Sequence, residues 1–253
     1  KKINFFVILR INSKMNLVVD IGNTSLKYFL FSERLILESY KNNFISNEKI
    51  LNDIKNKFSS IENIIYSDVR NNEGLNFSRY FPQALVIRCS SKLKLPFTSI
   101  YKPLNKLGED RISLLSSKCL NYPQKNALII DIGTCITYDF IDNKNIHHGG
   151  SISPGFHSRY KSLSHSTKKL PFLSYKTPEI ITGNSTEKSI HSGVYYGILS
   201  EIKYQIKFYT KQYKNIIVVL TGGDSIVLPK SLKNSIFVDQ NFLAQGLNYL
   251  LDL

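Results

Sequence analysis

The sequence predicts an α/β protein made of two duplicated halves with a cleft between them. The first observation is a repeated pattern, in which an apolar strand runs into Asp-Ile-Gly and a second strand follows at once. One copy starts at residue 17 and the other at residue 128, about half the chain apart. The second observation is that strands and helices are mixed along both copies, which is typical of α/β domains. A cleft between two such halves is a default place for a ligand.

The first half is expected to begin with a strand hairpin. A buried strand at 17–19 and a second strand at 26–31 flank a turn in which Gly22 and Asn23 tolerate the positive φ of a tight hairpin. Apolar periodicity, helix-start residues and turn residues predict the other elements of this half. These are a helix over 46–58, strands at 64–66 and 84–87, a loop over 90–105 and a helix over 109–120.

The second half repeats the hairpin and then adds a long helix. A strand is expected at 136–141, and the glycines of residues 149–155 predict a turn-rich loop. Apolar β-branched residues recur every fourth position from Ile190 to Ile206, which predicts a helix over 185–213. The remaining elements are a buried strand at 216–220 that ends in T-G-G-D at 221–224 and a short helix over 241–250.

The chain is expected to contain an upstream extension at 1–14, an N-terminal half at 15–125 and a C-terminal half at 126–253. The apolar run at 5–9 is too short for a signal peptide and is interrupted by Arg10, so Met15 is the expected natural start. No stretch approaches the length of a membrane span, and we therefore expect no membrane partner.

The composition favours a protein of the reducing cytosol that has no nucleic-acid partner. The chain has 33 Lys+Arg against 19 Asp+Glu, a formal charge of +14. The excess is mostly scattered lysine, in pairs such as Lys168-Lys169 and not in runs, which argues against dedicated nucleic-acid binding. Cys89, Cys119 and Cys135 are far apart and form no C-x-x-C pair, so neither a disulfide framework nor a zinc site is indicated.

Three turns that each follow a buried strand point to phosphate chemistry. The first places the Asp20 carboxylate beside exposed backbone N–H groups and the Thr24 hydroxyl, with Lys27 within reach. Such turns bind phosphate oxygens, and a carboxylate there can hold Mg²⁺ through water. The second turn covers 131–139 and the third covers 221–224. Each one alone is typical of an ordinary turn, but the three together favour a nucleotide site.

Other signatures of nucleotide and hydrolase sites are absent from the sequence. It has no G-x-x-x-x-G-K-[ST], no H-R-D or D-F-G set and no G-x-S-x-G, which argues against a P-loop, a protein kinase and a nucleophile elbow. His147 and His148 are adjacent, which is poor spacing for shared metal ligation, so we interpret them as a solvated loop pair.

Asp110, at the start of the expected 109–120 helix, allows two interpretations. A carboxylate near a helix N-terminus is favoured by the helix dipole, so capping explains it without any functional role. In the other interpretation, Asp110 orients and deprotonates a hydroxyl while Arg111 binds an anion, two roles that suit phosphoryl transfer. The residues alone leave both interpretations open.

The ordered set of motifs resembles that of type III pantothenate kinases, a family of the actin/hexokinase-like superfamily. The set consists of D-x-G-N-T at 20–24, a Tyr-Pro element at 101–103, G-x-D-R at 108–111, D-x-G-T-x-x-T-x-D at 131–139, G-G-x-I-x-P-G at 149–155 and T-G-G-D at 221–224. The resemblance covers about residues 15–253, and its specificity lies in order and spacing. The proline of the Tyr-Pro element comes one place earlier than in the family's Y-x-x-P.

The resemblance implies a fold and a set of site residues. The fold would be two actin/ribonuclease H-like halves, each with a mixed sheet flanked by helices. Asp110 would be the catalytic base, and Asp131 would bind a monovalent cation. The residues that would bind ATP are Asp20, Ile21, Gly22, Asn23, Thr24, Ser25, Leu26, Lys27 and Thr134. Those that would contact pantothenate are Tyr101, Gly108, Glu109, Asp110, Arg111 and Thr186.

The resemblance also implies a reaction, the ATP-dependent phosphorylation of pantothenate to 4'-phosphopantothenate at the start of coenzyme A biosynthesis. Mg²⁺ and K⁺ or NH₄⁺ would assist, in a cytoplasmic homodimer. Two alternatives stay open. Another small-molecule kinase of the superfamily would keep the three turns. It would differ from a pantothenate kinase at the residues implied to contact the substrate, which are Tyr101, residues 108–111 and Thr186. A non-catalytic regulatory protein would fit the basic charge, but the three intact aspartates of the motifs argue against it.

Overall fold

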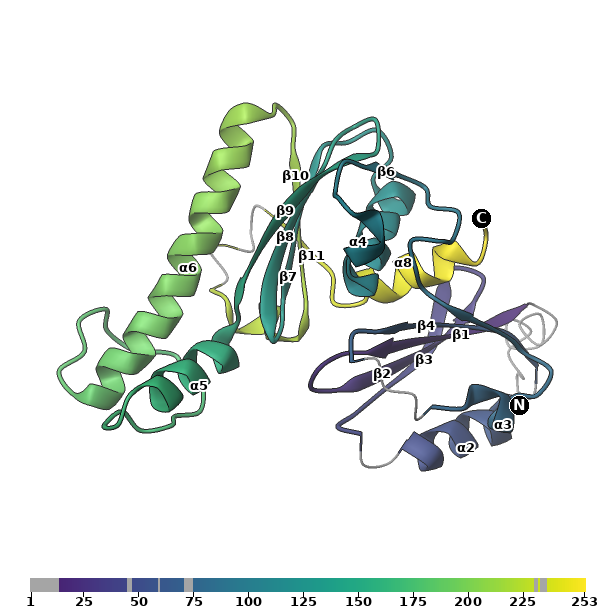
Figure 1. The fold of residues 1–253 in the computed structure, drawn as a ribbon, viewed down its shortest axis with the longest axis horizontal. Helices are drawn as coiled ribbons and strands as arrows, with labels where there is room; N and C mark the ends of the chain where they lie inside the picture. The colour runs from purple at the N-terminus through teal and green to yellow at the C-terminus, as the bar shows by residue number, and fades with distance from the viewer. Residues whose placement is uncertain (1–13, 45–46, 59, 71–74, 230–231, 233–235) are drawn as a thin grey trace, which may run out of the picture. The chain divides into compact units, whose positions relative to one another are not determined.

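The computed structural model describes residues 14–44, 47–58, 60–70, 75–229, 232 and 236–253. They form an α/β protein that divides into two compact units (Figure 1). Unit 1 contains the described residues up to Asn121 together with Phe242–Leu253, and unit 2 contains those of Tyr122–Asn241. The predicted α/β class is therefore confirmed.

Unit 1 is built on a mixed sheet. Its five described strands are β1 (Met15–Ile21), β2 (Leu26–Ser32), β3 (Leu35–Asn42), β4 (Ile61–Asp68) and β5 (Leu85–Arg88), in the order β3-β2-β1-β4-β5. The strands β1, β2 and β3 are antiparallel neighbours, whereas β4 runs parallel to β1 and β5 parallel to β4. The first Asp-Ile-Gly thus lies at the end of the central strand.

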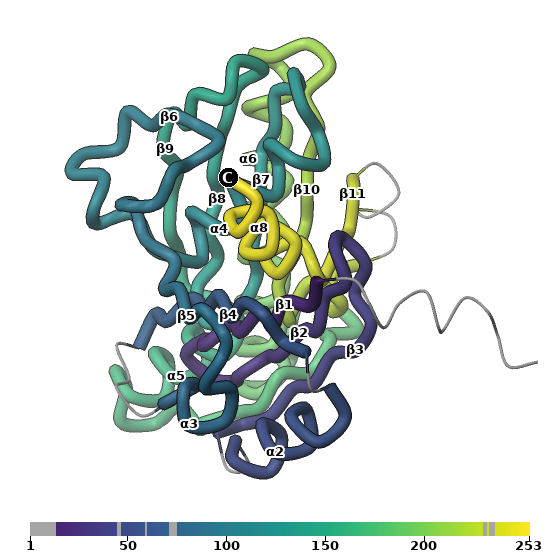
Figure 2. The backbone as a smooth tube through the Cα atoms, turned by 90° about the vertical axis from the view of Figure 1, so that its right-hand side faces the viewer, coloured from purple at the N-terminus to yellow at the C-terminus, as the bar shows by residue number. Residues whose placement is uncertain are grey.

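Helices cover both faces of this sheet (Figure 1). Unit 1 contains α2 (Asn47–Lys57), α3 (Phe77–Tyr80), the 3₁₀ helix η1 (Leu104–Lys106), α4 (Glu109–Asn121), α8 (Phe242–Leu250) and the short strand β6 (Thr98–Ser99). On one face, alternate apolar residues of β1 share a buried core with Leu51 and Ile54 of α2. On the other face, α4 and α8 lie side by side and contact β4, as Figures 1 and 2 show.

Unit 2 has its own mixed sheet and its own core. The strands are β7 (Ala127–Ile132), β8 (Cys135–Ile141), β9 (Ile146–Pro154), β10 (Ile217–Thr221) and β11 (Phe237–Val238). The helices are α5 (Phe156–Ser166), α6 (Thr186–Gln212) and the 3₁₀ helix η2 (Gly223–Val227). Alternate residues of β7 and β8 form a buried core with the predicted apolar stripe of α6, from Ile190 to Ile202. That stripe was readable in the sequence because it faces the sheet.

The two units repeat one topology. In unit 2 the strands run in the order β9-β8-β7-β10-β11, and β7 has an antiparallel neighbour on one side and a parallel neighbour on the other. This order and these directions are the same as those around β1 in unit 1. In both units the central strand leads into Asp-Ile-Gly. The predicted duplication is therefore present in the sheet connectivity.

The compact units differ from the expected halves at the C-terminus. The short helix expected over 241–250 is present as α8, but it belongs to unit 1 and not to the half expected at 126–253. The physical reason is its close packing on α4, because a Cβ at Gly246 would clash with the carbonyl of Ser113. Leu247 is also fully buried. Apart from Lys14, the expected extension at 1–14 lies outside the described residues.

The turn-rich loop expected at 149–155 is wrong, since strand β9 extends to Pro154. The glycines serve strand pairing. A side chain at Gly150 would clash with the carbonyl of Tyr138 on β8, so only glycine allows the two strands to pair there. Gly149 has φ of +96° beside a register shift between Phe140 and Ile141, which is the geometry of a β-bulge.

The interpretation of His147 and His148 as a solvated pair is also wrong for one of them. His147 lies on β9 and is fully buried, and its Nε2 is 2.8 Å from a carboxylate oxygen of Asp139, which is buried as well. His148 is partly exposed and pairs with Asp142 at 2.9 Å. His147 is paired with Ile141 in the strand ladder, whereas His148 is the extra residue of the β-bulge, so the two adjacent histidines have different environments.

No helix in the described part of the chain combines the length and the apolar character needed to span a membrane. The helix α6 spans 27 residues, but charged residues such as Glu201, Lys203 and Lys207 interrupt it.

Candidate functional site

The first Asp-Ile-Gly turn places a carboxylate among polar neighbours at the end of β1. Asp20 is 8% exposed and lies opposite Lys27 on β2 and Ser67 on β4. The Lys27 ammonium is 3.2 Å from one carboxylate oxygen, and the Ser67 hydroxyl donates to the other at 3.4 Å. Ile21 and Leu26, the next pair along the hairpin, are buried. Asp20 is therefore held by its strand neighbours, as a buried carboxylate requires.

The turn itself presents polar groups to solvent. The Gly22 N–H donates to the carbonyl of Ser25 at 3.1 Å, while Asn23 and Thr24 are exposed. Neither Gly22 nor Asn23 has a positive φ, so the left-handed turn expected there is wrong. The connection is long enough to close with ordinary backbone angles. The polar side chains of the exposed residues Asn23 and Thr24 remain suited to phosphate oxygens.

Tyr101 and the G-x-D-R residues come together near the start of α4. A carboxylate oxygen of Asp110 accepts the backbone N–H of Arg111 at 2.8 Å. A side chain at Gly108 would displace that same oxygen, so glycine leaves room for the carboxylate. Arg111 is 4% exposed, and its guanidinium lies 5.2 Å from the centroid of the Tyr101 ring, within the range of a cation–π contact. Residues grouped by sequence are thus neighbours in the structure.

Glu109 differs from the other residues of the G-x-D-R motif, because its carboxylate is hydrogen-bonded to residues at the ends of two strands, β4 and β5. One oxygen accepts the backbone N–H of Asp68 at 2.7 Å, and the other accepts from Nε of Arg88 at 2.8 Å. Burial raises the pKa of Glu109 above its usual range, although the Asp68 amide and Arg88 oppose that rise. Sequence reasoning missed Arg88 and Asp68, and the only signal was a charged residue at the end of each strand.

In unit 2 the second and third predicted turns meet. Asp131 ends β7 and lies opposite Thr221 of β10, whose strand leads into T-G-G-D. Gly222 has φ of +91°, and a Cβ there would clash with the Asp131 carboxylate and with the backbone of Ile132. Only glycine therefore lets this loop lie against the β7–β8 turn.

A buried hydroxyl lies beside Asp131. Thr137 of β8 is directly opposite Asp131, so the two side chains lie on the same face of the sheet. Thr137 is 7% exposed, and its hydroxyl has no hydrogen-bond partner in the structure as described. An unpartnered buried hydroxyl costs free energy unless a ligand or water satisfies it. The pair offers two oxygen ligands that suit a hard cation.

Thr134 follows in the turn after β7. Its backbone carbonyl accepts the Gly155 N–H at 3.0 Å and the Ser158 hydroxyl at 2.6 Å. A Cβ at Gly155 would clash with the Gly133 carbonyl. The start of α5 thus fixes the turn that carries Thr134, a connection that the sequence did not reveal.

Thr186 lies elsewhere in unit 2, as the exposed first residue of α6. The Ser185 hydroxyl caps this helix by accepting the Lys188 N–H at 3.3 Å. A Cβ at Gly183 would clash with the backbone of Lys188 and Ser189, so the preceding loop folds tightly over the first turn. No described contact joins Thr186 to the other predicted site residues of unit 2.

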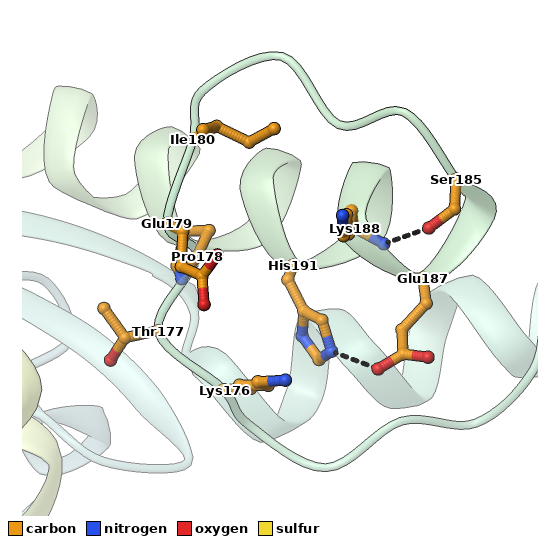
Figure 3. Close-up of a pocket in the computed structure, with 9 residues that line it drawn as sticks. All are labelled: Lys176, Thr177, Pro178, Glu179, Ile180, Ser185, Glu187, Lys188 and His191. Atoms are coloured by element: carbon orange, nitrogen blue, oxygen red, sulfur yellow. Dashed lines mark hydrogen bonds and ion pairs between the residues drawn. The ribbon is translucent and has the colours of Figure 1, made fainter.

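A cavity of about 150 Å³ adjoins the start of α6 (Figure 3). Its lining residues are Lys176, Thr177, Pro178, Glu179, Ile180, Ser185, Glu187, Lys188 and His191. The imidazole of His191 is paired on both nitrogens, with the Tyr160 hydroxyl at 2.8 Å and with Glu187 at 3.5 Å. Figure 3 shows His191 and Glu187 facing each other beneath the loop. These contacts explain His191 as a structural residue.

Metal ligation by protein atoms alone is not supported in the described part of the chain. No group of three or more His, Cys, Asp or Glu side chains there is arranged to hold a metal ion. A cation bound at Asp20 or at Asp131 would therefore complete its coordination with water or ligand oxygens, as Mg²⁺ usually does.

Comparisons with known proteins agree with this geometry. The family model for type III pantothenate kinase matches residues 16–207. A protein of Flavobacterium psychrophilum named type III pantothenate kinase is 38% identical over 239 residues, which cover 93% of this chain and 98% of that protein.

Solved structures show the same fold. A conserved protein from Campylobacter jejuni, assigned to the Baf family of transcriptional activators, superposes with a TM-score of 0.60 at 24% identity, covering 93% of this chain and 97% of the other. A protein from Sinorhizobium meliloti assigned as a 2-dehydro-3-deoxygalactonokinase gives a TM-score of 0.55 at 10% identity, covering 94% and 97%. At these identities the likeness concerns the fold alone.

Proposed function

The chain belongs to the type III pantothenate kinase family, and we propose that it transfers the γ-phosphate of ATP to the primary hydroxyl of pantothenate. The product, 4'-phosphopantothenate, is the first intermediate on the way to coenzyme A. The observation that best supports this proposal is the group formed by Tyr101, Gly108, Asp110 and Arg111. In this group the Asp110 carboxylate accepts the backbone N–H of the buried residue Arg111, whose guanidinium lies over the Tyr101 ring.

In the proposed reaction, Asp110 accepts the proton of the pantothenate hydroxyl. The hydroxyl oxygen then forms a bond to the γ-phosphorus, the bond from that phosphorus to the β–γ bridging oxygen breaks, and ADP leaves. The turn that carries Asn23 and Thr24 would hold the phosphates through backbone N–H groups and hydroxyls. Arg111 would offset negative charge on the substrates, since phosphoryl transfer depends mainly on positioning and charge. Bound Mg²⁺ supplies further charge compensation.

Asp20 and Lys27 form a pair that fits the binding of Mg²⁺ and of the ATP phosphates. The carboxylate of Asp20 suits a hydrated Mg²⁺, and the Lys27 ammonium that neutralises it at 3.2 Å could turn to a phosphate oxygen. We propose that Asp20, Ile21, Gly22, Asn23, Thr24, Ser25, Leu26 and Lys27 form one side of the ATP site, with Thr134 as a further ATP contact.

We propose K⁺ or NH₄⁺ as a second cation at Asp131. The carboxylate of Asp131 and the unpartnered hydroxyl of Thr137 lie opposite each other on neighbouring strands, and a cation there would give the Thr137 hydroxyl a partner. We also propose that Thr186 contacts pantothenate and that the protein acts as a cytoplasmic homodimer. The location is proposed because Cys89, Cys119 and Cys135 form no C-x-x-C pair and are free thiols in the structure.

The reaction can be tested by ADP release from purified protein with Mg²⁺ and pantothenate, measured in K⁺ and in Na⁺. We expect release that depends on pantothenate and that K⁺ increases. The same assay with a hexose or acetate in place of pantothenate tests the alternative. ADP release that depends on one of these compounds, and not on pantothenate, would indicate another small-molecule kinase. If folded protein released no ADP in response to pantothenate with K⁺ present, the proposed function would be wrong.

Replacing Thr137 by Val should remove the response to K⁺ without loss of stability. The hydroxyl is buried and unpartnered, so an apolar side chain of the same shape should leave the free energy of unfolding unchanged or raise it. Asp131→Asn should lose the same K⁺ response. The measurements are ADP release against K⁺ concentration and the melting temperature. A Thr137→Val variant that is activated by K⁺ like the parent would show that this hydroxyl is not a ligand.

A further inference from the structure

A closed group of hydrogen bonds joins the start of α4 to the ends of two strands in unit 1. The Glu109 carboxylate accepts the Asp68 N–H at 2.7 Å and Nε of Arg88 at 2.8 Å. Nη2 of Arg88 donates to the backbone carbonyl of Asp68 at 3.1 Å. The three residues come from the ends of β4 and β5 and from the first position of α4. Each is therefore bonded to both of the others.

This arrangement fixes the place of Asp110. The Asp110 carboxylate is bonded to the backbone of its own helix, through the Arg111 N–H at 2.8 Å. Its position in unit 1 consequently depends on where the first turn of α4 lies. Glu109 is the adjacent residue, and its two charge-assisted bonds tie that turn to the ends of β4 and β5.

The same strand end leads to the phosphate turn. Ser67, the residue before Asp68, lies opposite Asp20 in the β1–β4 pairing and donates to its carboxylate at 3.4 Å. The Val69 N–H donates to the carbonyl of Ile21 at 3.2 Å. The end of β4 is thus bonded on one side to the turn proposed for ATP and on the other to the helix that carries the proposed base.

We propose that Glu109 and Arg88 are positioning residues, which hold the start of α4, and with it Asp110, at a fixed place relative to the β1–β2 turn. This inference rests on the proposed function. It replaces the expectation that Glu109 contacts pantothenate, because both of its carboxylate oxygens are already engaged within unit 1. A displacement of about 1 Å in a reacting group can cost roughly 10²-fold in rate, so a loosened turn should be visible in kcat.

Two substitutions test the group. Glu109→Gln keeps the shape of the side chain but places an amide N–H₂ against either the Asp68 N–H or Arg88, so one bond is lost. Arg88→Met keeps the aliphatic stem and removes both donors. Each variant should lower kcat by about 10-fold and leave KM for ATP near the parental value, since the β1–β2 turn is unchanged. Arg88→Lys should recover part of the loss, because its ammonium restores a charged donor to Glu109.

The matched control is Arg79→Met, which removes the guanidinium of another Arg–Glu pair in unit 1. Arg79 lies 3.9 Å from Glu48, and both side chains are largely exposed. Its kcat should equal that of the parent, because exposed ion pairs contribute little. Melting temperatures of all variants identify any general loss of structure.

The deciding measurement is a double-mutant comparison. If Arg88 acts through Asp110, Arg88→Met should lower kcat about 10-fold in the parent but scarcely at all in an Asp110→Asn background. Equal losses in both backgrounds would overturn the inference, because they would show a structural effect independent of Asp110. An unchanged kcat in Arg88→Met and Glu109→Gln would also overturn it, with the proposed function intact. A parent without pantothenate-dependent ADP release would overturn the proposed function and, with it, this inference.

Discussion

Asp110→Asn should lower kcat for pantothenate phosphorylation by roughly 10²-fold or more, because an amide cannot accept the proton of the hydroxyl. KM for ATP should hardly change, since Asp110 would face the acceptor and not the nucleotide. The free energy of unfolding should fall by at most about 1 kcal/mol, because asparagine also satisfies the start of a helix. The structure supports a large loss of kcat with little loss of stability. The amide oxygen of the introduced asparagine can still accept the Arg111 N–H, as the carboxylate of Asp110 does.

The measurements are kcat, KM for pantothenate and melting temperature on one preparation. Asp53→Asn is a matched control, because it makes the same chemical change at an exposed position of α2 in the same unit. It should leave all three values near those of the parent. A near-parental kcat for Asp110→Asn would eliminate Asp110 as the base and leave only the helix-terminal interpretation.

The parts of the fold that local sequence determines were the parts that could be predicted. The hairpins, the helix α4 and the long helix α6 were expected within two residues of their observed ends, because apolar periodicity and turn residues act over short distances. The strand β3 and the helices α3 and α5 were not predicted. In β3, half-buried and exposed residues are mixed and none is fully buried, so its pattern is weak.

Long-range contacts explain the remaining differences. Nothing in the local sequence shows that Gly246 lets α8 approach Ser113, or that Gly150 pairs β9 with Tyr138, because each glycine meets a residue far away in the chain. The same limit applies to the candidate site. The motif predicted the grouping of Gly108, Asp110 and Arg111, since they are adjacent, whereas Arg88 reaches Glu109 only through the order of strands in the sheet.

Gly222→Ala should be the most disruptive single-methyl substitution at the candidate site. The residue has φ of +91°, where an L side chain costs about 1–2 kcal/mol. The added methyl would also meet the Ile132 backbone and the Asp131 carboxylate, so the loop after β10 must move away from the β7–β8 turn. We expect the free energy of unfolding to fall by at least about 2 kcal/mol in total. Because the displaced loop lies against Asp131, the response of ADP release to K⁺ should be lost as well.

Gly223→Ala provides the matched control, one residue further along the same loop. A Cβ at Gly223 meets no atom within 4 Å, and its φ is not in the positive region. That variant should keep its stability within about 0.5 kcal/mol of the parent, as surface substitutions usually do, and it should retain activation by K⁺. Melting temperature and ADP release against K⁺ concentration, measured on both variants, make the comparison. Equal effects at the two positions would show that general loosening of the T-G-G-D loop, and not its contact with Asp131, controls the site. A large loss confined to Gly222→Ala would support the close approach of the loop to Asp131 as the feature that keeps the cation site in shape.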